Sequence, residues 1–207
     1  MKNKIILFDI DGTIFDSNSF LNDFCREASS QFGLSQKDVE EIKNIYTESK
    51  KDDYFRPSDF LKKISIKFPL IKPDLVEKIF WDVDLFAKNL YKDTSVIEDL
   101  ANFAVIGIFS KGDIKFQKQK VFSFKQFLND DNIYIFPNKI AKIQEVFGKY
   151  NDFEIYFVDN EREVLLKAES LFPNITAVLI DRSNQYQNNN NLIKIRDLSE
   201  LKSIINI

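Results

Sequence analysis

The sequence predicts an α/β protein in which a doubly wound parallel sheet carries an inserted α-helical cap. Short runs of β-branched and aromatic residues alternate with helical patterns over the second half of the 207-residue chain. This alternation implies right-handed crossovers between parallel strands. One early interval of helical character is also far longer than a single crossover needs. We therefore expect residues 1–16 and 95–207 to form the α/β core and residues 17–94 to form the cap.

The first strand is expected at Ile5–Phe8, a continuous apolar run that stops at Asp9. Such a run is typical of a strand buried on both faces of a parallel sheet. Four further candidates are short and rich in β-branched or aromatic residues. These strands are expected at 104–109, 133–136, 154–158 and 175–180. The helical patterns that separate them cover 114–128, 139–148 and 161–171.

The cap interval contains four helical patterns. They cover 18–32, 36–49, 57–67 and 73–90. The last two begin with Pro57 and Pro73, and proline is well tolerated in the first turn of a helix. Between the second and third patterns, Lys50 to Asp53 is a run of charged residues that we expect to form a solvated turn.

Composition narrows the possible functions. The net charge of −3 favours neither a nucleic acid nor an anionic membrane as a partner. The chain has no histidine, which excludes Ser-His-Asp and Cys-His mechanisms and histidine-based metal sites. The first apolar run is too short for a signal peptide or a membrane span, and the single cysteine, Cys25, suggests a reducing compartment. We expect a cytoplasmic protein, whose oligomeric state the sequence leaves open.

Polar residues follow four of the expected strands. Asp9 and Asp11 follow the first strand, residues 110–113 (Ser-Lys-Gly-Asp) the second, Lys139 the third and Asp159-Asn160 the fourth. Any one of them alone is more often a turn or a helix cap. Because parallel strands end at the same edge of a sheet, where ligands bind in open α/β folds, we expect these residues to converge.

The carboxylates in this set predict a metal ion. Three carboxylates, Asp9, Asp11 and Asp159, meeting within about 4 Å would repel by roughly 4 kcal/mol per pair at an effective dielectric constant near 20. One lysine cannot offset three such pairs. A hard divalent cation can, and Mg²⁺ is the usual choice where a phosphate completes the coordination shell. Glu163, one turn after Asp159, could accept from a metal-bound water, although its role as a helix-start residue is slightly favoured.

The same residues suggest chemistry on a phosphate ester. Asp9 can act as a nucleophile that forms an aspartyl-phosphate, and Asp11 as the acid and base that serves the leaving group and the water. This division of labour needs no histidine.

Three further groups at this edge could stabilise the transferred phosphoryl group. Ser110 and the main-chain amides of Lys111 and Gly112 could hold its oxygens, while Lys139 neutralises the developing charge.

These motifs resemble those of the haloacid dehalogenase-like superfamily, in the branch with a helical cap after the first strand. Residues 9–13 match its Asp-x-Asp-Gly-Thr motif, whose Thr13 we count among the phosphate-binding residues. Ser110, Lys139 and Asp159 match the second, third and fourth motifs. The segment from Ser110 to Asp113 also resembles a variant found in phosphatase-like members, as do two residues downstream of it, Gln117 and Lys120.

The resemblance implies a Rossmann-like core and a Mg²⁺ cofactor held by Asp9, Asp159 and the main-chain carbonyl of Asp11. The chain departs from the fourth motif at Asn160 and Glu163, where some members have a second acid. Family members that cleave carbon–halogen bonds lack the second aspartate of the first motif. Asp11 therefore argues for phosphate chemistry.

Three functions are compatible with these residues. The leading hypothesis is a Mg²⁺-dependent phosphatase acting on a small phosphorylated metabolite. A phosphomutase would use the same residues, and a non-catalytic binding protein of the same fold is the third possibility. In the cap, Arg56 could grip an anionic part of the substrate, although a surface salt bridge or a helix-entry contact is the favoured interpretation.

Overall fold

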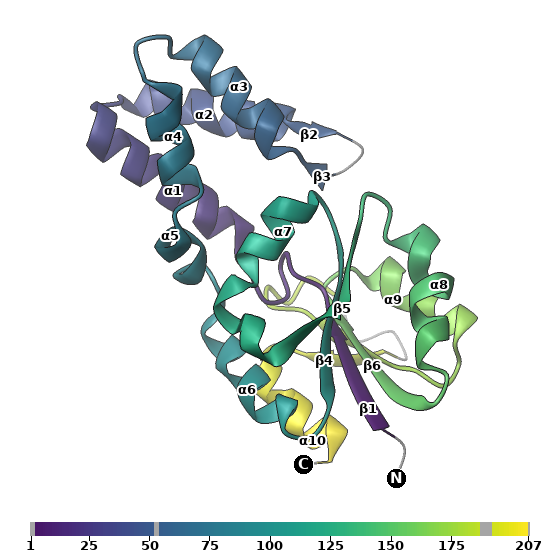
Figure 1. Cartoon of the computed structure of the whole chain (residues 1–207). Coiled ribbons are helices and arrows are strands. Elements are labelled where there is room, and N and C mark those ends of the chain that lie inside the picture. Colours follow the sequence, from purple (N-terminus) through teal and green to yellow (C-terminus); the bar gives the residue numbers. More distant parts are fainter. Residues whose placement is uncertain (1–2, 52–53, 187–191, 207) are drawn as a thin grey trace.

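A computed structural model of the chain describes residues 3–51, 54–186 and 192–206. It consists of a sheet flanked by helices and a lobe of helices beside it (Figure 1). The six strands of the sheet are all parallel and lie in the order β5-β4-β1-β6-β7-β8. Their bounds are β1 Asn3–Phe8, β4 Val105–Lys111, β5 Leu128–Phe136, β6 Phe153–Asp159, β7 Thr176–Ile180 and β8 Ile193–Ile195. The predicted fold class is confirmed.

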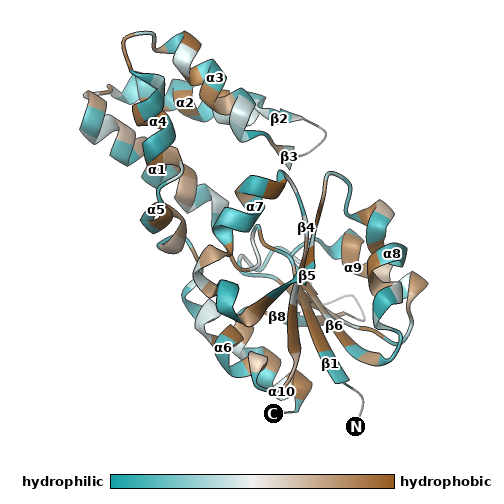
Figure 2. Ribbon diagram, viewed as in Figure 1, coloured by the Kyte–Doolittle hydropathy of each residue, from teal (hydrophilic) through white to brown (hydrophobic). Residues whose placement is uncertain are grey.

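Strand β1 lies inside the sheet and is buried on both faces. Ile5 and Leu7 belong to one hydrophobic cluster and Ile6 and Phe8 to another, and all four side chains are fully buried. Successive side chains of a strand point to opposite faces, so this division follows from the continuous apolar run. In Figure 2 the strands in the middle of the large sheet are mostly brown, that is, hydrophobic.

Helices cover both faces of the sheet. On one face lie α6 Val96–Ala101, α7 Ile114–Lys120 and α10 Leu201–Ile205, and on the other α8 Ile143–Phe147 and α9 Arg162–Leu171. The helical segments predicted at 114–128 and 139–148 are only partly α-helical. Phe122–Phe127 and Ile140–Lys142 form 3₁₀ turns instead. The segment predicted at 161–171 is confirmed as α9.

The cap interval folds into helices, as predicted, between β1 and β4. They are α1 Ser17–Phe32, α2 Gln36–Glu48, α3 Pro57–Lys67, α4 Pro73–Phe80 and α5 Val83–Ala87. The single helix expected at 73–90 is wrong. The Asp82 carboxylate accepts hydrogen bonds from the main-chain N–H groups of Asp84 and Leu85 at 2.8 and 3.2 Å. This N-cap starts a new helix and so separates α5 from α4.

A short antiparallel hairpin joins α2 to α3. Its strands are β2 Lys50–Lys51 and β3 Tyr54–Phe55, with Lys50 opposite Phe55. The solvated turn expected over Lys50 to Asp53 is therefore wrong for its first two residues, and Asp52 and Asp53 lie outside the described residues. In Figure 1 the hairpin extends from the helical lobe toward the sheet.

The cap and the core share one apolar interior. The Phe116 ring of α7 packs against four phenylalanine rings of the cap, with centroids 5.2 to 5.7 Å apart. Those rings belong to Phe20, Phe55, Phe80 and Phe86. Stacked and edge-on phenylalanine pairs add to the free energy of apolar burial. The cap is therefore docked on α7.

The chain enters and leaves the cap through two segments that lie side by side. The N–H of Asp16 donates to the carbonyl of Asn89 at 2.9 Å, and that of Tyr91 donates to the carbonyl of Ile14 at 3.1 Å. Asp16 also caps the first helix, α1. These crossings lie close to the predicted boundaries at residues 16 and 95. Independent folding of the two parts stays a prediction.

Three core elements were absent from the expectations: strand β8 and the short helices α6 and α10. Strand β8 has only three residues, which is too few for a period to be recognised. Helix α6 has only six. None of the helices in the described ranges is long and apolar enough to cross a membrane.

Arg182, just after β7, fastens the loop after β1 to the end of the cap. Its Nη2 and Nε atoms donate to the carbonyl of Thr13 at 2.6 and 3.2 Å. Its Nη1 atom lies 2.9 Å from Asp93, a carboxylate that is only 7% exposed, and its guanidinium lies 3.7 Å from the centroid of the Tyr91 ring. One side chain thus connects three distant segments.

We expect Arg182→Ala to lower the free energy of unfolding by about 3 kcal/mol, because it leaves Asp93 as a buried charge without its partner. The surface pair Arg26–Asp23, in which Arg26 is 67% exposed, supplies the control. Arg26→Ala is expected to cost at most about 0.5 kcal/mol. Urea unfolding of both variants tests this, and equal losses would contradict it.

Candidate active site

Asp9, Lys139 and Asp159 form a buried ion triad at the carboxyl ends of the strands. The Nζ of Lys139 lies 2.8 Å from Asp9 Oδ1 and 2.7 Å from Asp159 Oδ2. Asp9 follows β1 directly, and its N–H donates to the carbonyl of Val158 in β6 at 2.9 Å. The side chains that the sequence predicted to converge from three strand ends do so.

Burial governs the protonation of this triad. It raises the pKa of Asp9 despite the opposing effect of Lys139, and it raises that of Asp159 to about 7. Burial alone would lower the pKa of Lys139, but the two carboxylates raise it above its ordinary value. Lys139 is therefore charged, and the two carboxyl groups paired with it ionise less readily than usual.

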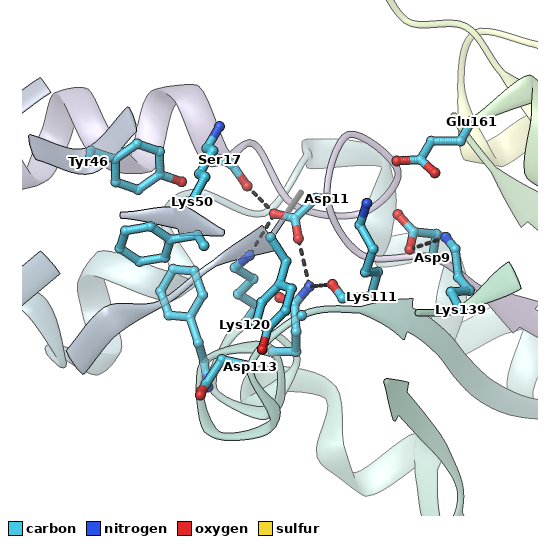
Figure 3. A pocket seen from close by; sticks show the side chains of 15 residues that line it. Asp9, Asp11, Ser17, Tyr46, Lys50, Lys111, Asp113, Lys120, Lys139 and Glu161 are labelled. Atoms are coloured by element: carbon cyan, nitrogen blue, oxygen red, sulfur yellow. Dashed lines mark hydrogen bonds and ion pairs between the residues drawn. The ribbon is translucent and has the colours of Figure 1, made fainter. Parts of the chain in front are cut away.

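The Asp11 carboxylate is held apart from the triad. Its Oδ1 atom accepts from Lys120 Nζ at 2.6 Å and from the Ser17 hydroxyl, and its Oδ2 atom accepts from Gln117 Nε2 at 2.7 Å (Figure 3). Desolvation would raise the pKa of Asp11, but Lys120 and the other donors lower it. Two of the three carboxylates expected to meet do so, and Asp11 is instead kept ionised by α7 and the start of α1.

The last residues of β4 contact the Gln117 side chain. Ser110 is 1% exposed, and its Oγ atom lies 3.2 Å from Gln117 Nε2, which also donates to the carbonyl of Lys111 at 2.7 Å. Gly112 has φ +149°, and a Cβ atom there would lie 2.9 Å from the Gln117 side chain. Lys111 and Gly112 line the cavity, whereas Ser110 and the buried Thr13 do not.

A cavity of about 180 Å³ connects these residues to the cap. Asp9, Asp11 and Lys139 form its core side, and Tyr46 and Lys50 belong to its cap side (Figure 3). The Asp11 side chain is 40% exposed, which reflects its position on the wall of this cavity. The predicted nucleophile and the predicted acid–base residue thus face the same space.

Glu161 is a site residue that the sequence did not reveal. Its side chain lines the cavity and points toward Asp9 in Figure 3, and its N–H donates to Asp159 Oδ1 at 2.8 Å. Glu163, the second acid considered from the sequence, is exposed on α9 and does not line the cavity. The sequence could have indicated Glu161, because this residue lies in the turn between β6 and α9 and so remains near the end of the strand. Glu163 already lies inside the helix.

The loop after β1 packs closely on the loop after β6. Gly12 has φ +76°, and a Cβ atom at this position would lie 2.4 Å from Asn160 Nδ2. Glycine is therefore needed both for the left-handed conformation and for the close approach. This contact fixes Asp11 relative to the strand end that carries Asp159.

The acidic side chains at this edge of the sheet fit a divalent cation that needs only one or two carboxylate ligands. Asp9 and Asp159 share one lysine, Lys139, and a third acid, Glu161, lines the cavity with Asp9. However, the described part of the chain holds no group of three or more Asp, Glu or Cys side chains arranged to bind a metal. Mg²⁺ is often bound by one or two carboxylates and completed by water and phosphate oxygens. Such a site is compatible with Asp9 and Asp159 as its carboxylates.

Comparisons with known proteins give structural matches only. No family model and no curated protein sequence matches the chain. One similar solved structure is a haloacid dehalogenase-like hydrolase from Burkholderia xenovorans, with a TM-score of 0.76 and 16% identity over 99% of this chain and 97% of that one. A second is the magnesium-bound HAD-hydrolase YfnB from Bacillus subtilis, with a TM-score of 0.67 and 16% identity over 100% of both chains. A third is a HAD phosphatase from Thermococcus onnurineus, with a TM-score of 0.63 and 22% identity over 98% of this chain and 97% of that one. At these identities the matches establish the fold alone. The chain has the fold of the haloacid dehalogenase-like hydrolases, as its motifs predicted.

Proposed function

We propose that this protein is a Mg²⁺-dependent phosphatase that hydrolyses small phosphate monoesters through an aspartyl-phosphate on Asp9. One observation supports this most strongly: two aspartates two residues apart face one cavity in different environments. Asp9 is buried with Lys139, and Asp11 is held separately by Lys120 and Gln117. Two carboxylates in different environments are suited to two different roles.

The first step transfers the phosphoryl group. A carboxylate oxygen of Asp9 attacks phosphorus, the ester P–O bond breaks, and the leaving alkoxide takes a proton from Asp11. Lys139, at Asp9 Oδ1, offsets negative charge that develops on the phosphoryl group. In the second step Asp11 takes a proton from water as that water attacks phosphorus, which releases inorganic phosphate and restores Asp9.

The contacts of Asp11 favour the second step. A carboxylate that accepts from Lys120, Gln117 and Ser17 is ready to take a proton from water. Its role as an acid in the first step requires a higher pKa. A phosphate dianion entering beside it acts in that direction, because a nearby like charge raises the pKa of a carboxyl group.

A bound Mg²⁺ would offset charge on the phosphate oxygens during transfer. Asp9 and Asp159 are the side chains that would hold it, with the main-chain carbonyl of Asp11 as the third protein ligand that the family motif implies. Glu161 lies close enough to the cavity to accept from water on the ion.

Phosphate chemistry is favoured over carbon–halogen cleavage by Asp11. A halide leaves without a proton, whereas an alkoxide needs one, so an acid beside the nucleophile is useful only for the ester. A phosphomutase would use the same residues and return the phosphoryl group to its substrate. Product analysis separates the two, because only the phosphatase releases inorganic phosphate.

The test is a panel of phosphate monoesters assayed at neutral pH with Mg²⁺ and with EDTA. We expect release of phosphate with Mg²⁺ and a loss of at least about 100-fold on chelation, restored when Mg²⁺ is added back. Circular dichroism in EDTA provides the control that the fold persists. Absence of hydrolysis of every ester with Mg²⁺ present would overturn the proposal and favour the non-catalytic alternative.

A further inference from the structure

Four lysines line the cavity, and two of them form ion pairs with aspartates. Lys139 bridges Asp9 and Asp159, and Lys120 pairs with Asp11. The other two are Lys111, at the end of β4, and Lys50, in the cap hairpin. Neither forms an ion pair with an acid in the described part of the chain. The site therefore offers two cations for an incoming anion, one from the core and one from the cap.

We propose that Lys50 is a specificity residue, and that the preferred substrates are small phosphate monoesters with a second anionic group that Lys50 binds. This rests on the proposed phosphatase function. The phosphate must reach Asp9 on the core side, which Lys111 also lines. The main-chain N–H of Gly112, expected from the sequence to hold a phosphate oxygen, instead donates to the carbonyl of Phe136 at 3.0 Å. Lys50 enters from the opposite, cap side, so its charge is placed for the other end of the substrate.

Packing within the cap holds Lys50 at the cavity. Lys50 pairs with Phe55 across the hairpin, and Phe55 stacks on Tyr46 with ring centroids 4.2 Å apart. The Lys50 ammonium lies 5.2 Å from the centroid of the same Tyr46 ring. A cation over an aromatic face is attracted to it and keeps its hydrogen-bond donors available. Tyr46 thus supports Lys50 without neutralising it.

The size of the cavity limits the substrate. At about 180 Å³ it is smaller than the range of about 300–1,000 Å³ typical of drug-sized ligands. Aromatic side chains of Tyr46, Tyr54 and Phe55 line the cap side. Such a space suits a phosphate and a few additional heavy atoms, which places the second anion within reach of Lys50. A carboxylate is the smallest group that fits this description.

Arg56, the cap cation considered from the sequence, does not fill this role. It precedes α3 as its N-cap residue, its guanidinium lies 4.7 Å from the centroid of the Tyr54 ring, and it is not among the residues that line the cavity. The hairpin thus brings a different cation, Lys50, to the substrate.

The test compares two esters of the same carbon skeleton, 3-phosphoglycerate, which has a carboxylate, and glycerol 3-phosphate, which has a hydroxymethyl group in its place. The variants are Lys50→Met, which keeps the aliphatic stem, Lys50→Arg, which keeps the charge, and Lys50→Glu, which reverses it. Lys37→Met is the matched control, because Lys37 is exposed on α2 and does not line the cavity. kcat and KM are measured for both esters.

We expect the wild-type protein to have the higher kcat/KM for 3-phosphoglycerate. Lys50→Met should lower that value by roughly 10- to 100-fold, mainly through KM, and should leave glycerol 3-phosphate within about twofold. Lys50→Arg should restore the preference, Lys50→Glu should reverse it, and Lys37→Met should change neither ester. A general defect in folding would lower both esters together.

Two results are distinguishable. If the wild-type protein hydrolyses neither ester nor any other, the proposed function itself fails. If it hydrolyses both esters equally well, or if Lys50→Met lowers both by the same factor, the phosphatase stands and the role of Lys50 is overturned.

Discussion

Asp9→Asn is expected to lower kcat for phosphate ester hydrolysis by roughly 10⁴-fold or more, because the amide cannot form the aspartyl-phosphate, an acyl phosphate, on which the proposed reaction depends. The loss should appear in kcat, since the remaining cations still bind the phosphate. Rapid acid quenching with a radiolabelled ester should trap label on the wild-type protein and none on the variant.

The fold should survive this substitution. Burial raises the pKa of Asp9, so a neutral side chain of the same shape removes a desolvated charge, and Lys139 keeps Asp159 as a partner. We therefore expect an unchanged or higher thermal midpoint. Asp11→Asn is the companion variant: it should also lose turnover, but with Asp9 intact. Full activity of the Asp9 variant, or label trapped on it, would exclude the aspartyl-phosphate.

The sequence predicted the residues at the strand ends because their positions follow from local order. Asp9, Lys139 and Asp159 each come within three residues of a strand end, and parallel strands end at one edge. The positions of three strands were therefore enough to predict that these three side chains lie together. The resemblance added Gln117 and Lys120, whose contact with Asp11 depends on how α7 packs and not on any strand end.

Residues supplied by tertiary packing were not predictable in this way. Lys50 reads as part of a charged turn, and only its pairing with Phe55 and the docking of the cap bring it to the cavity. The orientation of the Asp11 side chain likewise depends on Ser17 in α1 and on α7. Because sequence spacing carries no information on these contacts, the expected cluster of three carboxylates became a pair and a separate, ionised Asp11.

Lys139→Met is expected to lower the free energy of unfolding by about 3–5 kcal/mol near neutral pH, because it leaves two buried carboxylates without their counter-ion. Asp9 and Asp159 are 4% and 0% exposed, so water cannot replace the ammonium group. Lys142→Met is the control. Lys142 is 41% exposed and pairs with Glu145 on the surface, and its loss should cost at most about 0.5 kcal/mol.

The cost of losing Lys139 should depend on pH in a defined direction. Burial, and to a smaller extent nearby carboxylates, raise the pKa of both carboxyl groups above the ordinary value even when Lys139 is present, and its removal should raise them further. A group whose pKa is higher in the folded chain stabilises folding below its unfolded pKa, and that contribution is lost as pH rises through the folded value. The variant should therefore lose stability as pH rises from about 4 toward neutral.

Urea unfolding in EDTA at several pH values tests this directly. The difference between wild type and Lys139→Met should be largest near neutral pH and should shrink on acidification, as protons replace the missing ammonium. Adding Asp9→Asn to the variant should recover part of the loss at neutral pH and little in acid, because it removes one of the two unpaired charges. If the loss of stability does not depend on pH and Asp9→Asn does not reduce it, Lys139 contributes through packing. The ammonium group would then not be the counter-ion of the two carboxylates that the proposed catalysis requires.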